Sequence, residues 1–274
     1  MCGTLEIMTI SFFEQLEAAL LPTAIQYTPE GSEPKAVSHQ WIHAISNGHT
    51  LFAENINIDK EKLISILINK NLYTNLDSFK QKLPTLPISP STISEFTFID
   101  LFAGIGGMRI GFQQAGGTCV FSSEFEKNAQ ATYFENHGDF PFGDITKIPT
   151  AHIPNHDVLI AGFPCQPFSH AGLKLGIEDT RGTLFHNIAN ILKEKKPSIA
   201  LLENVKGLIS HDKGYTLKVI LKTLTEMGYQ CNIDKKIITK GTAKQLQDEA
   251  KKMILKSTDF GLPQNRQDRK STRL

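Results

Sequence analysis

The fold of this chain is decided by residues 98–107, which read Phe98-Ile99-Asp100-Leu101-Phe102-Ala103-Gly104-Ile105-Gly106-Gly107. The stretch begins within an apolar run, Phe96 to Leu101, that predicts a buried strand. The glycines predict a tight turn, and residues Gly106 to Ala115 predict a helix that begins at this turn. Glycines at this point let a ligand approach the backbone closely, and the helix N-terminus offers free N–H groups. The stretch therefore predicts a strand, a turn and a helix that together can hold a ligand.

The same alternation of strand and helix continues along the chain. Further strands are expected at 118–123, 140–142, 157–163 and 198–202, and further helices at 127–136, 183–195 and 215–227. Strands that alternate with helices of about a dozen residues predict an α/β fold with a doubly wound, mostly parallel, Rossmann-like sheet. Residues 229–238 and 253–257 are expected to form a closing pair of strands, with a polar helix at 243–251 between them.

The N-terminal part of the chain has a different pattern. Helical spacing occurs at 12–20 and 60–68, and residues 82–94 are rich in proline, serine and threonine. We therefore expect a small helical N-terminal appendage of unknown role at 1–81, a linker at 82–95 and the α/β domain at 96–274. The histidines around Trp41 lack carboxylates or cysteines at matching spacing, so they are interpreted as ordinary core or surface residues and no metal site is expected.

Composition sets broad limits. The 274 residues are 40% hydrophobic and 21% charged, which is ordinary for a globular protein, and no apolar run is long enough to cross a membrane. The N-terminus lacks a basic region before its apolar residues, so a cytoplasmic location is expected. The four cysteines have no metal-site spacing and are expected to be reduced. Residues 1–95 carry a formal charge of −4 and residues 96–274 one of +5, so a polyanion would meet the second part.

Two carboxylates suggest the kind of ligand that the glycine turn would hold. Glu124 lies 20 residues after Gly104 at the end of the second expected strand, where it can accept both hydroxyls of a ribose. Asp144 follows the next short strand and is either an acceptor for an adenine amine or a turn cap. Asp100 precedes the turn, and an acid there disfavours a pyrophosphate and suits a cationic cofactor such as S-adenosylmethionine.

A candidate nucleophile follows the apolar run 157–163. Cys165 stands between Pro164 and Pro167, which fix the backbone, and a cysteine in that position is poor core filler. Glu203 follows the strand expected at 198–202. In doubly wound folds ligands bind at the carboxyl ends of the strands, so Glu203 is a candidate for the same site.

Taken in order, these segments resemble the C5-cytosine DNA methyltransferase family. The resemblance covers Phe96 to about Arg266, and its blocks are FIDLFAGIGG, SSEFEK, GDI, GFPCQPFS, EDTRGTLF, ENVKGL and DFGLPQNR. It implies an S-adenosylmethionine-dependent methyltransferase fold and methyl transfer to C5 of a cytosine flipped out of double-stranded DNA, in the setting of a bacterial restriction–modification system and of nucleoid association. A nicotinamide-dependent dehydrogenase is a competing interpretation, in which the Pro-Cys-Gln segment would have no role.

The resemblance also implies roles for individual residues. Cys165 would add to C6 of cytosine, Glu203 would assist at N3, and Arg266 would lie near the base. The cofactor would contact Phe102, Gly104, Gly106, Gly107, Glu124, Phe125, Asp144, Ile145 and Pro164. DNA or the loop over the flipped base would involve Gln166, Ser169 and Arg181.

The chain departs from the family near its end. Position 268 is Asp where the family has a second arginine, and the final residues, Lys270 to Leu274, do not resemble the family. The DNA-recognition region and the closing blocks are not present. We therefore expect a C-terminally truncated catalytic domain with an unpaired sheet edge, arising from a gene-model artefact or from a split enzyme completed by a second polypeptide. An RNA (tRNA) cytosine-5 methyltransferase and an inactive fragment acting as a binding or regulatory module remain alternatives.

Overall fold

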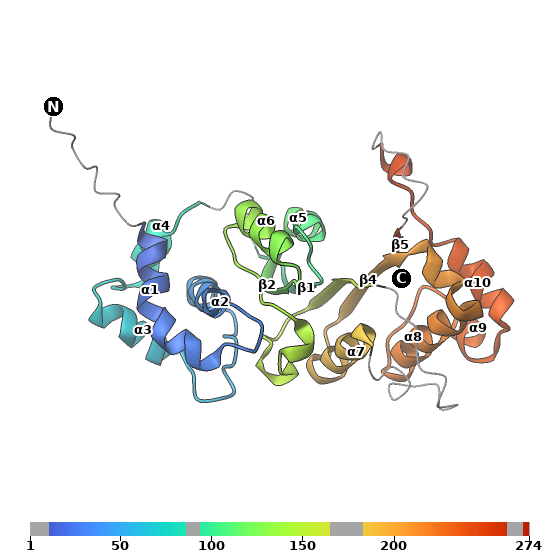
Figure 1. The fold of residues 1–274 in the computed structure, drawn as a ribbon, viewed down its shortest axis with the longest axis horizontal. Coiled ribbons are helices and arrows are strands. Elements are labelled where there is room, and N and C mark those ends of the chain that lie inside the picture. Colours follow the sequence, from blue (N-terminus) through green and yellow to red (C-terminus); the bar gives the residue numbers. More distant parts are fainter. Residues whose placement is uncertain (1–10, 86–93, 165–182, 262–270, 274) are drawn as a thin grey trace. The chain divides into compact units, whose positions relative to one another are not determined.

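The computed structural model describes residues 11–85, 94–164, 183–261 and 271–273, the last three by their backbone only (Figure 1). The α-helices are α1 (Phe12–Ala24), α2 (Pro34–Asn47), α3 (Lys60–Asn69), α4 (Leu76–Lys82), α5 (Gly107–Gln114), α6 (Lys127–His137), α7 (Leu184–Lys195), α8 (Tyr215–Glu226), α9 (Lys235–Lys240) and α10 (Ala243–Lys251). The strands are β1 (Phe96–Leu101), β2 (Gly117–Ser123), β3 (Val158–Gly162), β4 (Ile199–Val205) and β5 (Ser271–Arg273). Short 3-10 turns are η1 (Ile25–Tyr27), η2 (Ile145–Lys147), η3 (Thr150–His152), η5 (Lys206–Ile209), η6 (His211–Gly214) and η7 (Ser257–Phe260).

The chain folds into two compact units, and neither is one continuous stretch. The first unit contains residues 1–95 and 104–155, and the second contains residues 96–103 and 156–274. These boundaries differ from the expected division at 81 and 95, because the first unit joins the N-terminal helices to residues 104–155, where α2 contacts β2. The expected linker lies partly in α4 and partly, at 86–93, outside the described residues.

The second unit contains a sheet whose central strands are parallel. β1 pairs with β3 through Phe98↔Val158 to Leu101↔Ala161, and β3 pairs with β4 through Val158↔Ile199 to Gly162↔Glu203. β3 is buried along its first four residues, as its apolar sequence indicates. The predicted α/β class with a mostly parallel sheet is confirmed.

Other parts of the second unit differ from expectation. Residues 229–238 do not form a strand, because Asp234 caps α9 by accepting the N–H of Lys236 at 2.6 Å. Residues 253–257 form no strand either, and one residue pair, Ser123↔Phe142, replaces the short strand expected at 140–142 in the first unit. β5 pairs antiparallel with Glu203–Val205 of β4, so that part of the sheet edge is not unpaired as expected.

The first unit is built around α2. The expected helices at 12–20 and 60–68 are confirmed as α1 and α3, and α1 begins with a capping box made by Ser11 and Glu14. α2 was not expected, because Lys35, His39, Gln40 and His43 interrupt its apolar pattern. It is nevertheless largely buried, including Trp41 at 0% exposure, because it contacts α1 as well as β2. Within the described ranges, no helix is long and apolar enough to cross a membrane.

Candidate active site

The glycine turn before α5 has the backbone that the sequence predicts. Gly104 has φ +56° and Gly106, the N-cap of α5, has φ +87°, a region that favours glycine. No heavy atom lies within 4 Å of the position that a Cβ would take at Gly104 or Gly107. A Cβ at Gly106 would instead overlap the imidazole of His137. A side chain would therefore find open space at Gly104 and Gly107, whereas Gly106 packs closely against His137.

Glu124 connects this turn to the end of β2. Its carboxylate accepts the N–H of Gly104 and the N–H of Glu126, both at 2.7 Å. The side-chain amide of Gln130 donates to the Glu124 carbonyl at 2.5 Å. A carboxylate has about four acceptor positions, so these two backbone bonds leave room for ribose hydroxyls. The acceptor positions that remain on Glu124 therefore fit an adenosine-containing cofactor.

Phe125 and Ile145 lie in opposite environments. The side chain of Phe125 is 73% exposed, which is unusual for an aromatic residue outside a binding surface, while Ile145 is buried. Asp144 acts as a turn cap, since its carboxylate accepts the N–H of Thr146 at 2.9 Å. Phe125 and Asp144 are thus presented at the surface of the first unit, and Ile145 contributes to its core.

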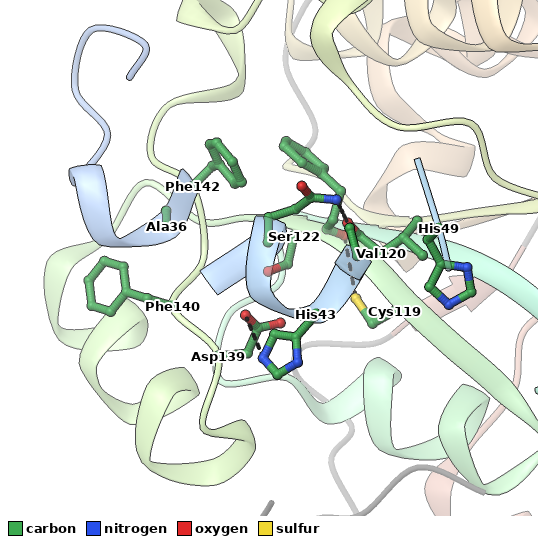
Figure 2. Close-up of a pocket in the computed structure, with 12 residues that line it drawn as sticks. Ala36, His43, His49, Cys119, Val120, Ser122, Asp139, Phe140 and Phe142 are labelled. Carbon is green, nitrogen blue, oxygen red and sulfur yellow. Dashed lines mark hydrogen bonds and ion pairs between the residues drawn. The ribbon is translucent and has the colours of Figure 1, made fainter. Parts of the chain in front are cut away.

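A buried charged cluster supports the turn from within the first unit. Arg109 of α5 donates to the Tyr133 hydroxyl at 2.9 Å and to the Asp139 carboxylate at 3.1 Å. Figure 2 shows His43 of α2 facing Asp139, with 3.8 Å between Nε2 and Oδ1. Burial, followed by the charge of Arg109, lowers the pKa of His137 from 6.5 to about 4. These residues, which the sequence interpretation missed, carry no motif, and only their packing identifies them.

The second unit contains Glu203 and the start of the nucleophile segment. The register Gly162↔Glu203 puts Glu203 beside the last residue of β3, and the nucleophile segment follows directly. The side-chain amide of Asn204, 1% exposed, donates to the carbonyl of Phe163 at 2.7 Å, and its oxygen accepts the N–H of Val205 at 2.9 Å. Pro164 is exposed. The strand ends therefore bring Pro164 and Glu203 to one edge of the sheet.

The remaining predicted site residues lie just after β1 or outside the described residues. Phe102 lies at the end of β1 with φ +55°, an uncommon conformation for a residue with a side chain. Outside the described residues lie Cys165, Gln166, Ser169, Arg181 and Arg266. Within the described part of the chain, no group of three or more His, Cys, Asp or Glu residues is arranged to hold a metal ion.

The family model for C-5 cytosine-specific DNA methylase matches residues 96–269. The chain belongs to this family. The match covers the parallel sheet, the glycine turn and the Glu203 strand, and it excludes the N-terminal helices α1 to α4. The family implied by the sequence motifs is confirmed.

Three relatives show how far the similarity extends. The Type II methyltransferase M1.ScrFI of Lactococcus lactis subsp. cremoris is 52% identical over 66% of this chain and 42% of its own length. M.NlaX of Neisseria lactamica is 54% identical over 63% of this chain and 50% of its own. M.HpaII of Haemophilus parainfluenzae is 50% identical over 65% of this chain and 46% of its own. The chain thus matches about half the length of these relatives.

Proposed function

We propose that this chain carries the cofactor-binding and nucleophile-bearing part of an S-adenosylmethionine-dependent DNA (cytosine-5-)-methyltransferase of a bacterial restriction–modification system. The observation that carries the proposal is the pairing of Glu203 in β4 with Gly162 in β3. Gly162 lies three residues before Cys165 in the sequence. The relatives named as type II methyltransferases support the restriction–modification setting. The partner would be double-stranded DNA, and the location cytoplasmic.

The cofactor would be held mainly by residues of the first unit, and the resemblance to the family adds Phe102 and Pro164. Gly104 and Gly107 leave open space, Glu124 would accept the ribose hydroxyls, and Asp144 would accept from the adenine amine. Phe125 offers an exposed ring for stacking. When bound, S-adenosylmethionine supplies an electrophilic methyl group on its sulfonium. A cationic ligand also suits the acid Asp100 that precedes the turn.

The chain's own residues would activate the base. The Cys165 thiolate adds to C6 of a flipped-out cytosine, and the electron pair of the C5=C6 bond makes C5 nucleophilic. Glu203 shares a proton with N3 and so stabilises the charge that develops on the ring. After C5 has gained its methyl group, loss of the C5 proton re-forms the double bond and expels the Cys165 thiolate. Asn204 holds the Phe163 carbonyl and so fixes the start of the nucleophile segment.

The cofactor part is tested by calorimetry with S-adenosylhomocysteine and with NAD. We expect binding of the former only, and about tenfold weaker binding in Glu124→Gln, because the amide cannot accept two backbone N–H groups and a ribose. Glu135→Gln, an exposed change on α6, is the matched control and should bind like the unchanged chain. Preference for NAD would contradict the proposal.

The nucleophile part is tested by trapping. Duplex DNA and tRNA that contain 5-fluorocytosine are incubated with the chain and S-adenosylmethionine, and covalent adducts are resolved by denaturing electrophoresis. We expect an adduct with DNA and none with Cys165→Ser. An adduct with tRNA alone would move the substrate to RNA, and an adduct that survives Cys165→Ser would refute the nucleophile. If neither DNA nor tRNA forms an adduct, the proposed catalytic role is refuted, and the proposed cofactor binding is unaffected.

A further inference from the structure

The segment Glu30–Glu33, between η1 and α2, lies against the turn that is expected to hold adenine. We define it as the N-terminal brace. It precedes the family match by more than 60 residues, so no motif of the family covers it. Yet it contacts Gly143, the residue before Asp144, and it pairs with lysines that follow both candidate carboxylates.

We propose that the N-terminal brace positions the adenosine end of the cofactor site, with Ser32 as a positioning residue for the Gly143–Asp144 turn. The inference rests on the proposed use of S-adenosylmethionine. Ser32 acts through the backbone of Gly143. Through this contact, residues 11–85, whose role the sequence leaves open, would take part in cofactor binding.

The central contact is one hydrogen bond. The N–H of Gly143 donates to the hydroxyl of Ser32 at 3.0 Å. The brace itself is fixed by a turn, in which the N–H of Ser32 donates to the carbonyl of Pro29 at 3.0 Å and Gly31 has φ +78°. A serine hydroxyl held by its own turn is a defined acceptor, so it fixes the position of the Gly143 amide.

Close backbone packing adds a second, independent contact. A Cβ at Gly143 would lie 2.7 Å from the carbonyl carbon of Gly31 and 3.2 Å from the Cα of Ser32, and it would overlap the Gly31 carbonyl oxygen. Only glycine at 143 allows the two backbones to lie this near each other. The brace and the turn are therefore fitted to each other and are not in incidental surface contact.

Two ion pairs flank the contact symmetrically. Lys127, three residues after Glu124, lies 3.1 Å from the carboxylate of Glu33. Lys147, three residues after Asp144, lies 3.4 Å from that of Glu30. Both pairs are largely exposed and contribute little to stability, because water screens them. The brace therefore pairs with the segment that follows each candidate carboxylate.

The brace is anchored by the buried face of α2. The Gln40 side chain, 6% exposed, accepts the N–H of Phe52 at 2.7 Å and donates to the Val120 carbonyl in β2 at 3.3 Å. The ring of Phe52 lies 4.5 Å, between centroids, from that of Phe142. Phe142 directly precedes Gly143, so the packing that anchors the N-terminal helices also fixes the residue from which the turn starts. Figure 2 shows Phe142, Val120 and Ala36 of α2 around this region.

The geometry of the turn controls the spacing of the two carboxylates. The N–H of Glu124 donates to the carbonyl of Phe142 at 2.8 Å, and that of Phe142 donates to the carbonyl of Ser122 at 2.9 Å. A shift at Gly143 would therefore move Asp144 relative to Glu124. Since ribose and adenine are joined by one covalent bond, which limits the distance between them, such a shift weakens the hold on both at once.

The test compares Ser32→Ala with Ser65→Ala. Ser65, on exposed α3, loses a comparable hydroxyl that donates to the Glu61 carbonyl at 2.8 Å and lies outside the brace. Binding of S-adenosylhomocysteine and of 5′-methylthioadenosine is measured by calorimetry on the full chain. We expect Ser32→Ala to weaken both ligands by the same factor, about threefold to tenfold, and Ser65→Ala to change neither. Ser32→Thr keeps the hydroxyl and should restore the affinity.

The outcomes separate this inference from the proposed function. If the unchanged chain binds neither ligand, the proposed cofactor is wrong and the inference falls with it. If the unchanged chain binds both and Ser32→Ala binds them equally well, the inference alone is overturned. Weakening of S-adenosylhomocysteine without weakening of 5′-methylthioadenosine would also overturn it, because the effect would lie at the amino-acid end. Weakening that Ser32→Thr does not restore would mean general destabilisation and would count against it.

Discussion

Among single residues, His137 makes the clearest pH-dependent contribution. It is fully buried beneath Gly106, and burial together with the charge of Arg109 lowers its pKa from 6.5 to about 4. The folded chain therefore keeps His137 neutral in a range where the unfolded chain protonates it. Between pH 6.5 and about 4 the unfolded state binds more protons, so the free energy of unfolding falls as the pH falls.

We expect urea unfolding at pH 7.5, 6 and 5 to show this loss, with a slope from one histidine of at most about 1.4 kcal/mol per pH unit. His43 has its pKa lowered by burial too and contributes in the same direction, while the Asp139 carboxylate between them stays ionised. His137→Gln, which cannot titrate, should reduce the slope below pH 6.5. An unchanged slope in that variant would contradict the assignment.

Asn204 makes a second contribution at this scale. Its amide donates to the Phe163 carbonyl and its oxygen accepts the Val205 N–H, in a buried position. Asn204→Asp keeps the acceptor, loses the donor and sets a carboxylate against a carbonyl. We expect a loss of about 2 kcal/mol or more in the free energy of unfolding, measured by thermal circular dichroism. Asn232→Asp, at an exposed position, is the control, and a loss of equal size there would argue against a specific role for Asn204.

At the scale of elements, the contact of α5 with α6 depends on the absence of a side chain at Gly106. A Cβ there would overlap the imidazole of His137, and φ is +87°. At Gly107, one residue on, no atom lies within 4 Å of the Cβ position and the φ is ordinary. We expect Gly106→Ala to lower the free energy of unfolding by about 1–3 kcal/mol and Gly107→Ala to leave it nearly unchanged or slightly improved. Equal effects of the two variants would show that the His137 contact is not formed.

The elements also show what could be foreseen from the sequence. Apolar runs followed by glycine turns predicted β1, β3, β4 and the helices α5 to α8, because burial and local turn chemistry act over short stretches. Residues 229–238, expected as one of a closing pair of strands, instead contain the start of α9, which Asp234 caps. α2 was missed because Gln40 and His39 are buried by contacts with β2 and with Phe140. These contacts join residues 80 and 101 positions apart in the sequence, so the sequence around α2 does not reveal them.

The candidate site was predictable to the same extent. Glu124 follows β2 as expected, Glu203 lies within the last residues of β4 and not after it, and Asp144 follows a single bridge, Ser123↔Phe142, and not a strand. Strand ends place ligands by a general rule, so the approximate position of these carboxylates could be predicted. Their supporting residues were not predictable: Ser32 acts through a hydrogen bond to Gly143, and His137 through steric contact with Gly106. Nothing in the spacing of these residues distinguishes them from ordinary surface or core positions.

For the whole molecule, the N-terminal helices and residues 104–155 should unfold as one cooperative body. Trp41, the only tryptophan, is buried in α2 and donates to the Phe52 carbonyl at 3.0 Å, while the Phe52 ring stacks on that of Phe121 in β2. We expect Phe121→Ala to lower the stability reported by Trp41 fluorescence by about 3 kcal/mol. Phe125→Ala, which removes an exposed ring, should change it by less than about 0.5 kcal/mol. An independent appendage would leave the fluorescence transition unmoved in both.

The interleaving of the two units has a practical consequence for anyone who cuts or rearranges the gene. The chain passes between them at residues 95–96, 103–104 and 155–156. Domain excision at the proline-rich stretch would strip Gly104–Asn155 of its covering helices, while the short piece Phe96–Ala103 would remain as β1. A rearranged gene that moves 104–155 ahead of 96–103, by contrast, would make each unit one uninterrupted stretch of polypeptide.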